Sequence, residues 1–129
     1  MFSHVVVGSN DLGTAKRFYD AVLSVLGLDK GQLRAKGDYV YQSGASTFIV
    51  TRPIDGQAAS AANGGTIGFV CQSRDQVDRW HAIGLAHGGK SIEDPPGVRH
   101  TEGGALYLAY MRDPDGNKLC ALHRPADGN

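Results

Sequence analysis

Two copies of one sequence pattern, offset by 62 positions, constrain this chain most. Each copy has a short β-branched run, then apolar residues at helical spacing, then a glycine that ends the helix. Such a duplication predicts two modules, about 1–55 and about 64–124, related by a pseudo-two-fold axis. The concave surface between them is the expected binding site, and the offset pairs His4 with Thr66. Other aligned pairs are Val5 and Ile67, Arg17 and Arg79, Phe18 and Trp80, Leu23 and Leu85, and Gly27 and Gly89.

The composition restricts partners and location. Residues 1–129 are expected to form a single domain with a formal net charge of zero. Because both signs are interspersed, we expect no nucleic acid or membrane partner. The two cysteines have no CxxC spacing, so a disulfide framework is not expected. We find no signal-peptide pattern at the N-terminus and no apolar run of about 18 residues, which favours a cytoplasmic protein.

The first copy begins with a strand and a helix. The valine-rich run 2–8 predicts a buried strand. Asn10 and Asp11 favour a helix start, and apolar residues recur at helical spacing over 12–26. Gly27 is the expected helix end.

A β-meander is predicted for the rest of the first copy. Its strongest strands are expected at 39–41 and 47–51, between turn signals. The alanine- and glycine-rich stretch 55–65 is expected to connect the copies and to lie over a pocket.

The second copy repeats this order. A strand is predicted at 66–71, and Ser73 followed by Gln76 forms a capping box that starts a helix. The pair Gly88-Gly89 is expected to end that helix, and 91–104 is expected to be mostly loop.

The chain then returns as a hairpin. We expect strands at 105–112 and 118–123, joined by a tight turn at 113–117. The full order, β-α-β-β-β twice, predicts an α+β fold. The two modules are expected to form a cupped mixed sheet with helices on one face and a central pocket for a small molecule.

Five short motifs, in this order, resemble those of the vicinal oxygen chelate superfamily. That group includes glyoxalase I, extradiol dioxygenases, fosfomycin-resistance enzymes and bleomycin-binding proteins. The resemblance covers almost the whole chain and is specific for the fold, not for a reaction. The motifs are His4-Val5-Val6, Asn10-Asp11-Leu12, Arg17-Phe18-Tyr19, Leu26-Gly27-Leu28 and Asp113 to Asn117.

The resemblance also implies where a metal would bind. Glyoxalase-like members hold one divalent ion with four side chains, from the first and last strands of each unit. Carried onto this chain, these positions match His4, Thr66 and Cys120. The fourth falls near Ile49, with Thr51 as the inward-facing alternative. His4 keeps a typical ligand and Cys120 is a second residue able to bind metal; the alternatives are a hydrogen-bonded histidine and a buried thiol.

Two ligands are fewer than the roughly three that a catalytic divalent site uses. A His4–Cys120 pair favours soft metals such as zinc or copper, so zinc, nickel, iron or copper are the candidates, and no cofactor is the alternative. The missing glutamate would have been the general base toward a metal-bound substrate. The sequence assigns no catalytic residue.

Further residues are candidates for the substrate pocket. Arg52 follows the last strand of the first copy and is either a surface residue or an anion ligand. His100 lies in the loop expected to overhang the cavity. Tyr107 and Tyr110 lie on opposite faces of their strand, so one of them faces the cavity. The candidate pocket set is Ile49, Thr51, Arg52, Thr66, His100 and Tyr110.

Two functions are compatible with these residues. One is a glyoxalase-like lyase or dioxygenase relative with a degenerate metal site. The alternative is a metal-independent protein that binds a small molecule of the antibiotic type. The resemblance further implies a homodimer.

Overall fold

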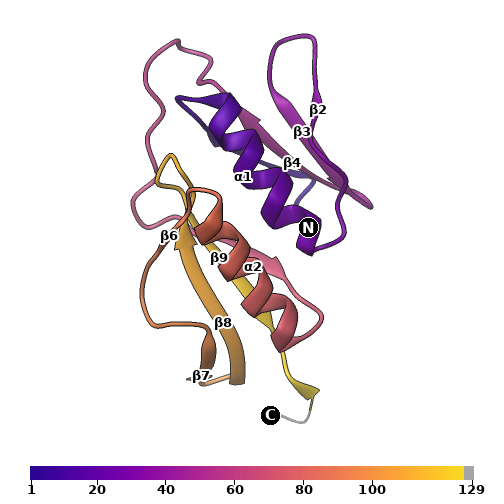
Figure 1. Cartoon of the computed structure of the whole chain (residues 1–129), viewed down its shortest axis with the longest axis vertical. Coiled ribbons are helices and arrows are strands. Elements are labelled where there is room, and N and C mark those ends of the chain that lie inside the picture. The colour runs from indigo at the N-terminus through magenta and orange to yellow at the C-terminus, as the bar shows by residue number, and fades with distance from the viewer. Residues whose placement is uncertain (127–129) are drawn as a thin grey trace.

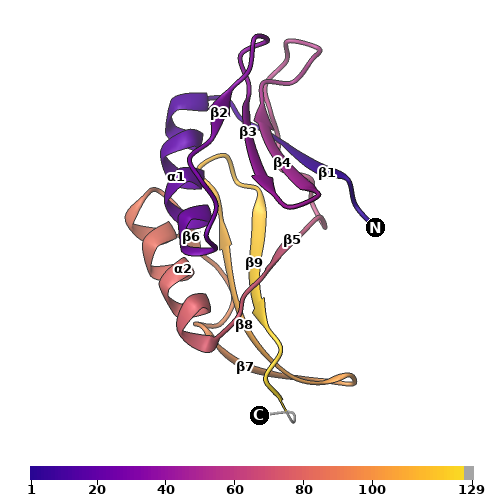
Figure 2. The same ribbon diagram turned by 90° about the vertical axis from the view of Figure 1, so that its right-hand side faces the viewer.

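The computed structural model describes residues 1–126 as two modules, each with one helix and one open sheet (Figure 1). Helices α1 (Leu12–Val25) and α2 (Arg74–Ala86) lie on one side of the molecule, and the strands lie on the other (Figure 2). This is the α+β fold with two modules that the duplicated pattern predicts.

The first module has the predicted β-α-β-β-β order. Its strands are arranged β1-β4-β3-β2, with β1 parallel to β4 and the other neighbours antiparallel. The sheet is therefore mixed, and β1 forms one of its edges. The strands are β1 (His4–Gly8), β2 (Gln32–Leu33), β3 (Tyr39–Ser43) and β4 (Ser46–Thr51).

The second module has the same sheet order with one strand more. Its sheet runs β5-β9-β8-β6, and β7 pairs with the first half of β8. The prediction that 91–104 is mostly loop was wrong for 97–101, because this segment folds back along β8 as a hairpin. The strands are β5 (Ile67–Val70), β6 (Lys90–Ser91), β7 (Gly97–Thr101), β8 (Gly104–Arg112) and β9 (Lys118–His123).

Strand register shows which positions of the two modules are equivalent. Val5 pairs with Phe48 in the first module, and Ile67 pairs with Leu119 in the second. Val5 and Ile67 are equivalent by the repeat, so β4 corresponds to β9 and β3 to β8. It follows that Ile49 and Cys120 occupy equivalent positions.

Both helices begin and end at the predicted residues. The Asp11 carboxylate accepts a hydrogen bond from the Thr14 amide, and the Ser73 hydroxyl accepts one from the Gln76 amide. These side chains satisfy amides that the first helical turn leaves unpaired. Gly27 ends the α1 segment with a φ of 88°, in the left-handed region that glycine adopts at low cost.

The core lies between the helices and the sheets, and an aromatic chain crosses it between the modules. The rings of Phe48 and Phe69 are 5.7 Å apart, and those of Phe69 and Trp80 are 6.4 Å apart. Gly84 allows α2 to approach β8, since a Cβ there would lie 2.1 Å from Met111 Cε. None of the helices within residues 1–126 is both long and apolar enough to cross a bilayer.

The connection between the modules, residues 52–66, passes the N-terminal end of α1. The Asn10 side chain donates to the Ala59 carbonyl at 3.1 Å and accepts from the Ala59 amide at 2.7 Å. These two bonds fix the middle of the connection against the first module.

Candidate functional site

The turn between β8 and β9 is organised by one buried carboxylate. Asp113 Oδ1 accepts hydrogen bonds from the amides of Asp115 and Asn117, each at 2.9 Å. Its Oδ2 accepts from the Asn117 side chain at 2.8 Å and from the Tyr19 hydroxyl at 2.5 Å. Only 4% of Asp113 is exposed. Burial, followed by the charge of Asp113, raises the pKa of Tyr19 well above its ordinary value, so this hydroxyl remains a donor.

The same turn reaches across to the first module. The Asn10 amide donates to Asp115 Oδ1 at 2.8 Å, and the Asn117 side chain donates to the Gly8 carbonyl at 3.3 Å. Together with Tyr19 on α1, these contacts make the turn a clamp between the modules. We call residues 113–117 the clamp turn.

The equivalent turn of the first module makes no such contacts. By strand register Ser43 corresponds to Asp113 and Ser46 to Asn117, and this turn is one residue shorter. Neither serine hydroxyl has a hydrogen-bond partner within residues 1–126, and neither reaches the second module. A space therefore remains where the clamp turn would lie.

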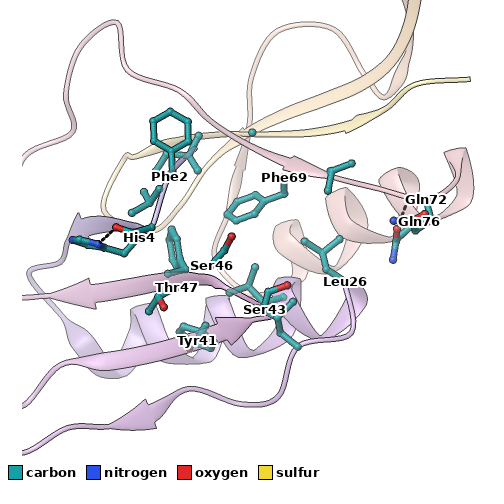
Figure 3. Close-up of a pocket in the computed structure, with 18 residues that line it drawn as sticks. Phe2, His4, Leu26, Tyr41, Ser43, Ser46, Thr47, Phe69, Gln72 and Gln76 are labelled. Atoms are coloured by element: carbon teal, nitrogen blue, oxygen red, sulfur yellow. Dashed lines mark hydrogen bonds between the residues drawn. The ribbon is translucent and has the colours of Figure 1, made fainter.

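That space is a groove of about 380 Å³ between the modules (Figure 3). Its position matches the clamp by symmetry, because Val70 and Gln72 line it and are the counterparts of Gly8 and Asn10. We call it the intermodule groove. Its lining consists of Phe2, Ser3, His4, Val5, Leu23, Leu26, Leu28, Tyr41, Ser43, Ser46, Thr47, Phe48, Ile67, Gly68, Phe69, Val70, Gln72 and Gln76.

The groove is mainly apolar and has firm walls. Phe48 and Phe69 belong to the aromatic chain of the core, and Leu26 is the C-terminal cap of α1. The Gln76 side chain accepts from the Gln72 amide at 2.6 Å and donates to the Val25 carbonyl at 2.8 Å. Gln76 is held at both ends, whereas the hydroxyls of Ser43 and Ser46 in the short turn are free polar groups of the groove.

His4 lies at the rim of this groove. Its side chain is exposed, and its Nδ1 is 2.7 Å from the Ser3 hydroxyl oxygen. Register places the other first-module candidates on the same sheet face: Ile49 lies beside Val6, and Thr51 beside Gly8. This face points away from α1, and it meets the groove lining at the paired residues His4 and Thr47.

Cys120 and Tyr110 are neighbours on the second sheet, on the face away from α2. They pair directly, and Cys120 also pairs with Gly68 of β5. Burial raises the pKa of the Cys120 thiol, so it stays protonated at neutral pH. Thr66 immediately precedes β5 and is exposed. Tyr107 lies on the opposite face, where its hydroxyl donates to Asp78 at 2.8 Å.

Arg52 and His100 lie elsewhere. Arg52 lines a second hollow of about 260 Å³ beside Ser9 and Asn10, at the N-terminal end of α1. His100 is on β7 opposite Ala105, so it shares the helix-side face of the sheet and is exposed. The sequence candidates thus fall into separate places rather than one pocket.

The side chains of one chain do not fit a catalytic metal ion. Within residues 1–126 no three His, Cys, Asp or Glu side chains gather at one point. His4 and Cys120 belong to different sheets.

Sequence reasoning missed two features of these surfaces. No sequence motif predicts the groove. It exists because the short turn 43–46 lacks the long side chains with which the clamp turn reaches the other module. Glu93 lies in a loop, as predicted, but its ion pair with Lys118 on the second sheet has no sequence signal.

Comparisons with known proteins agree on the family. The profile described as Glyoxalase/Bleomycin resistance protein/Dioxygenase superfamily matches residues 1–121. No similar sequence was found among curated proteins. A solved glyoxalase/bleomycin resistance protein from Albidiferax ferrireducens T118 is 56% identical, with a TM-score of 0.93 over 96% of this chain and 99% of that chain.

Two more distant structures show the fold alone. A putative glyoxalase from Bacillus halodurans is 19% identical, with a TM-score of 0.76 over 95% of each chain. A lactoylglutathione lyase from Agrobacterium tumefaciens is 22% identical, with a TM-score of 0.65 over 95% of this chain and 92% of that chain.

Proposed function

Because the chain belongs to the glyoxalase/bleomycin resistance protein/dioxygenase superfamily, we propose that it binds a small aromatic molecule in the intermodule groove without a metal ion. The observation that carries this proposal is the groove itself. Its volume of about 380 Å³ lies in the range of small-molecule sites, and its lining is mostly apolar with a few polar groups.

The walls define the ligand class. Phe2 and Phe69 offer aromatic surface, against which a flat ring packs in offset or edge-on geometry. The hydroxyls of Ser43 and Ser46 are free to donate to one acceptor on the ligand. A neutral aromatic compound with a single polar substituent therefore matches the groove.

The test is binding of the neutral fluorophore N-phenyl-1-naphthylamine to chelator-treated protein. We expect saturable fluorescence enhancement. Ser46→Phe fills the groove and should weaken binding at least tenfold, whereas the exposed Ser60→Phe in the connection should leave it unchanged. Saturable binding with the same affinity in Ser46→Phe as in the wild type would contradict the proposal. So would a lack of binding after chelator treatment.

A glyoxalase-type lyase reaction is the weaker candidate. It is normally run with a bound divalent ion, which the donors of one chain do not fit, and no carboxylate stands at Ile49 or Cys120 to act as the base. We expect well under one metal ion per chain by mass spectrometry of untagged protein purified without chelator. Stoichiometric metal that is lost in His4→Ala would reverse this ranking.

We also propose a homodimer formed through the sheet edges. β1 and β5 are edge strands, and the apolar side chains around them are exposed: Phe2 by 75%, Val70 by 72% and Val6 by 48%. Exposed apolar edges favour pairing with another chain. Light scattering should show a dimer that Val70→Lys dissociates and Leu33→Lys, on the far edge of the first sheet, does not. A monomer at micromolar concentration would refute it.

A cytoplasmic location remains part of this proposal. Cys71 and Cys120 are both unpaired and buried, as is usual for proteins of a reducing compartment. Fractionation of the native host should place the protein with cytoplasmic markers, and recovery from another fraction would overturn this.

A further inference from the structure

A small cluster on the second sheet is not explained by the groove. Lys118 projects from the start of β9, on the same face as Cys120 and Tyr110. Its ammonium lies 4.9 Å from the centre of the Tyr110 ring and forms an ion pair with the Glu93 carboxylate. The side chains of Lys118 and Glu93 are 26% and 46% exposed, so solvent and solutes reach the pair.

The loop that carries Glu93 is held in place. Arg99 donates to the carbonyls of Pro95 at 3.1 Å, Gly97 at 3.2 Å and Asp94 at 2.9 Å. Glu93 itself has a φ of 60°, and it is the non-glycine residue with positive φ within residues 1–126. Such a conformation costs conformational energy and persists when surrounding contacts enforce it.

Open sheet surface lies beside this ion pair. Gly68 pairs with Cys120, and a Cβ at Gly68 would meet no atom within 4 Å. Next to it are Leu122 and the edge of Tyr110, which are apolar. The face thus combines the Lys118 ammonium with an uncovered apolar floor.

We propose that Lys118 binds the carboxylate of a small aromatic acid whose ring lies over Gly68 and Cys120, and that Glu93 occupies the carboxylate position in the free protein. The ligand exchanges one carboxylate for another on Lys118 and releases Glu93 from the ion pair. This site meets the groove at Gly68, which borders both, and it does not rest on the function proposed for the groove.

The surrounding groups favour this exchange. Arg99 and Arg112, on the same face, donate to backbone carbonyl oxygens, so Lys118 is the cation that an acid can reach by displacing a side chain. The Cys120 thiol and the Tyr110 hydroxyl stay neutral at pH 7, since burial raises the pKa of each, and they do not repel an anion. Contact with the floor then adds apolar burial that Glu93 does not provide.

The test compares benzoate with its neutral analogue benzamide. In titrations followed by amide NMR, benzoate should shift signals of Tyr110, Cys120 and Leu122, which lie outside the groove lining, and benzamide should bind at least fivefold more weakly. Glu93→Gln should raise benzoate affinity by about threefold to fivefold, because an exposed ion pair is worth at most about a factor of five. Glu102→Gln, an equal charge change in the exposed β7–β8 turn, should have little effect.

Lys118→Met should abolish the preference for benzoate over benzamide, while Lys30→Met should keep it. Thermal unfolding of each variant confirms that it is folded. Equal binding of the two probes, an unchanged affinity in Glu93→Gln, or shifts confined to groove residues would overturn the proposal. Because N-phenyl-1-naphthylamine carries no charge, its binding to the groove succeeds or fails independently.

Discussion

The two hairpin turns of the molecule, 43–46 and 113–117, occupy equivalent places in the two modules and have opposite roles. The clamp turn buries Asp113 and joins its module to Gly8, Asn10 and Tyr19 of the other. The short turn presents free serine hydroxyls to a groove of about 380 Å³. One copy of the repeat thus holds the modules together, and the other leaves room for a ligand.

The difference teaches how a duplicated scaffold acquires a site. Both turns have the same β-ladder behind them and face an equivalent strand end and helix start. What differs is one residue of length and the reach of the side chains at two positions. A pocket appears where a structural contact is omitted, without any change in the fold.

The largest expected effect is loss of the clamp. Asp113→Ala removes an acceptor of four hydrogen bonds and leaves the buried Tyr19 hydroxyl unpaired. We expect the free energy of unfolding in urea to fall by roughly 3–4 kcal/mol. Asp115→Ala, which loses one bond to Asn10, should cost only about 1 kcal/mol. Equal costs for the two variants would show that Asp113 is not the centre of the clamp.

A smaller effect is expected from the Tyr19 hydroxyl, and it depends on pH. Tyr19→Phe should lower the free energy of unfolding by about 1–2 kcal/mol at pH 7. Because the pKa of Tyr19 is higher in the folded chain than in the unfolded one, its contribution is complete below about pH 10 and is lost as the pH rises further.

Urea unfolding between pH 9 and 11 tests this sign. The wild-type protein should lose stability more steeply above about pH 10 than Tyr19→Phe. Parallel curves would mean that the hydroxyl does not stay protonated against Asp113.

The smallest effect is expected at the equivalent turn. The double variant Ser43→Ala and Ser46→Ala removes two hydroxyls that have no protein partner. Its free energy of unfolding should stay within about 0.5 kcal/mol of the wild-type value. A loss comparable to that of Asp113→Ala would show that this turn is also structural.

Local sequence signals predicted much of the fold. The cap residues Asp11 and Ser73 start their helices as expected, and 118–123 is a strand with the predicted bounds. These features depend on nearest neighbours, so one chain suffices to recognise them. The strand at 97–101 was missed, since its pairing with β8 outweighs the local loop signals.

The candidate site was harder to predict than the fold. Motif matching drew attention to His4 and Cys120, which lie on different sheets, and to His100, which lies on the helix side. The groove depends on which side chains fail to reach across the module boundary, and that is a tertiary property. The position of Glu93 depends on hydrogen bonds from Arg99 to neighbouring carbonyls of the loop. Residue spacing in the sequence does not predict these bonds.

The most direct test locates a bound aromatic compound on the protein. Nuclear Overhauser contacts would be recorded between N-phenyl-1-naphthylamine and the methyl groups of the chelator-treated chain. Binding in the intermodule groove predicts contacts to Leu26 and Ile67. Contacts to Leu108 and Leu122 on the open face of the second sheet, with none in the groove, would contradict it.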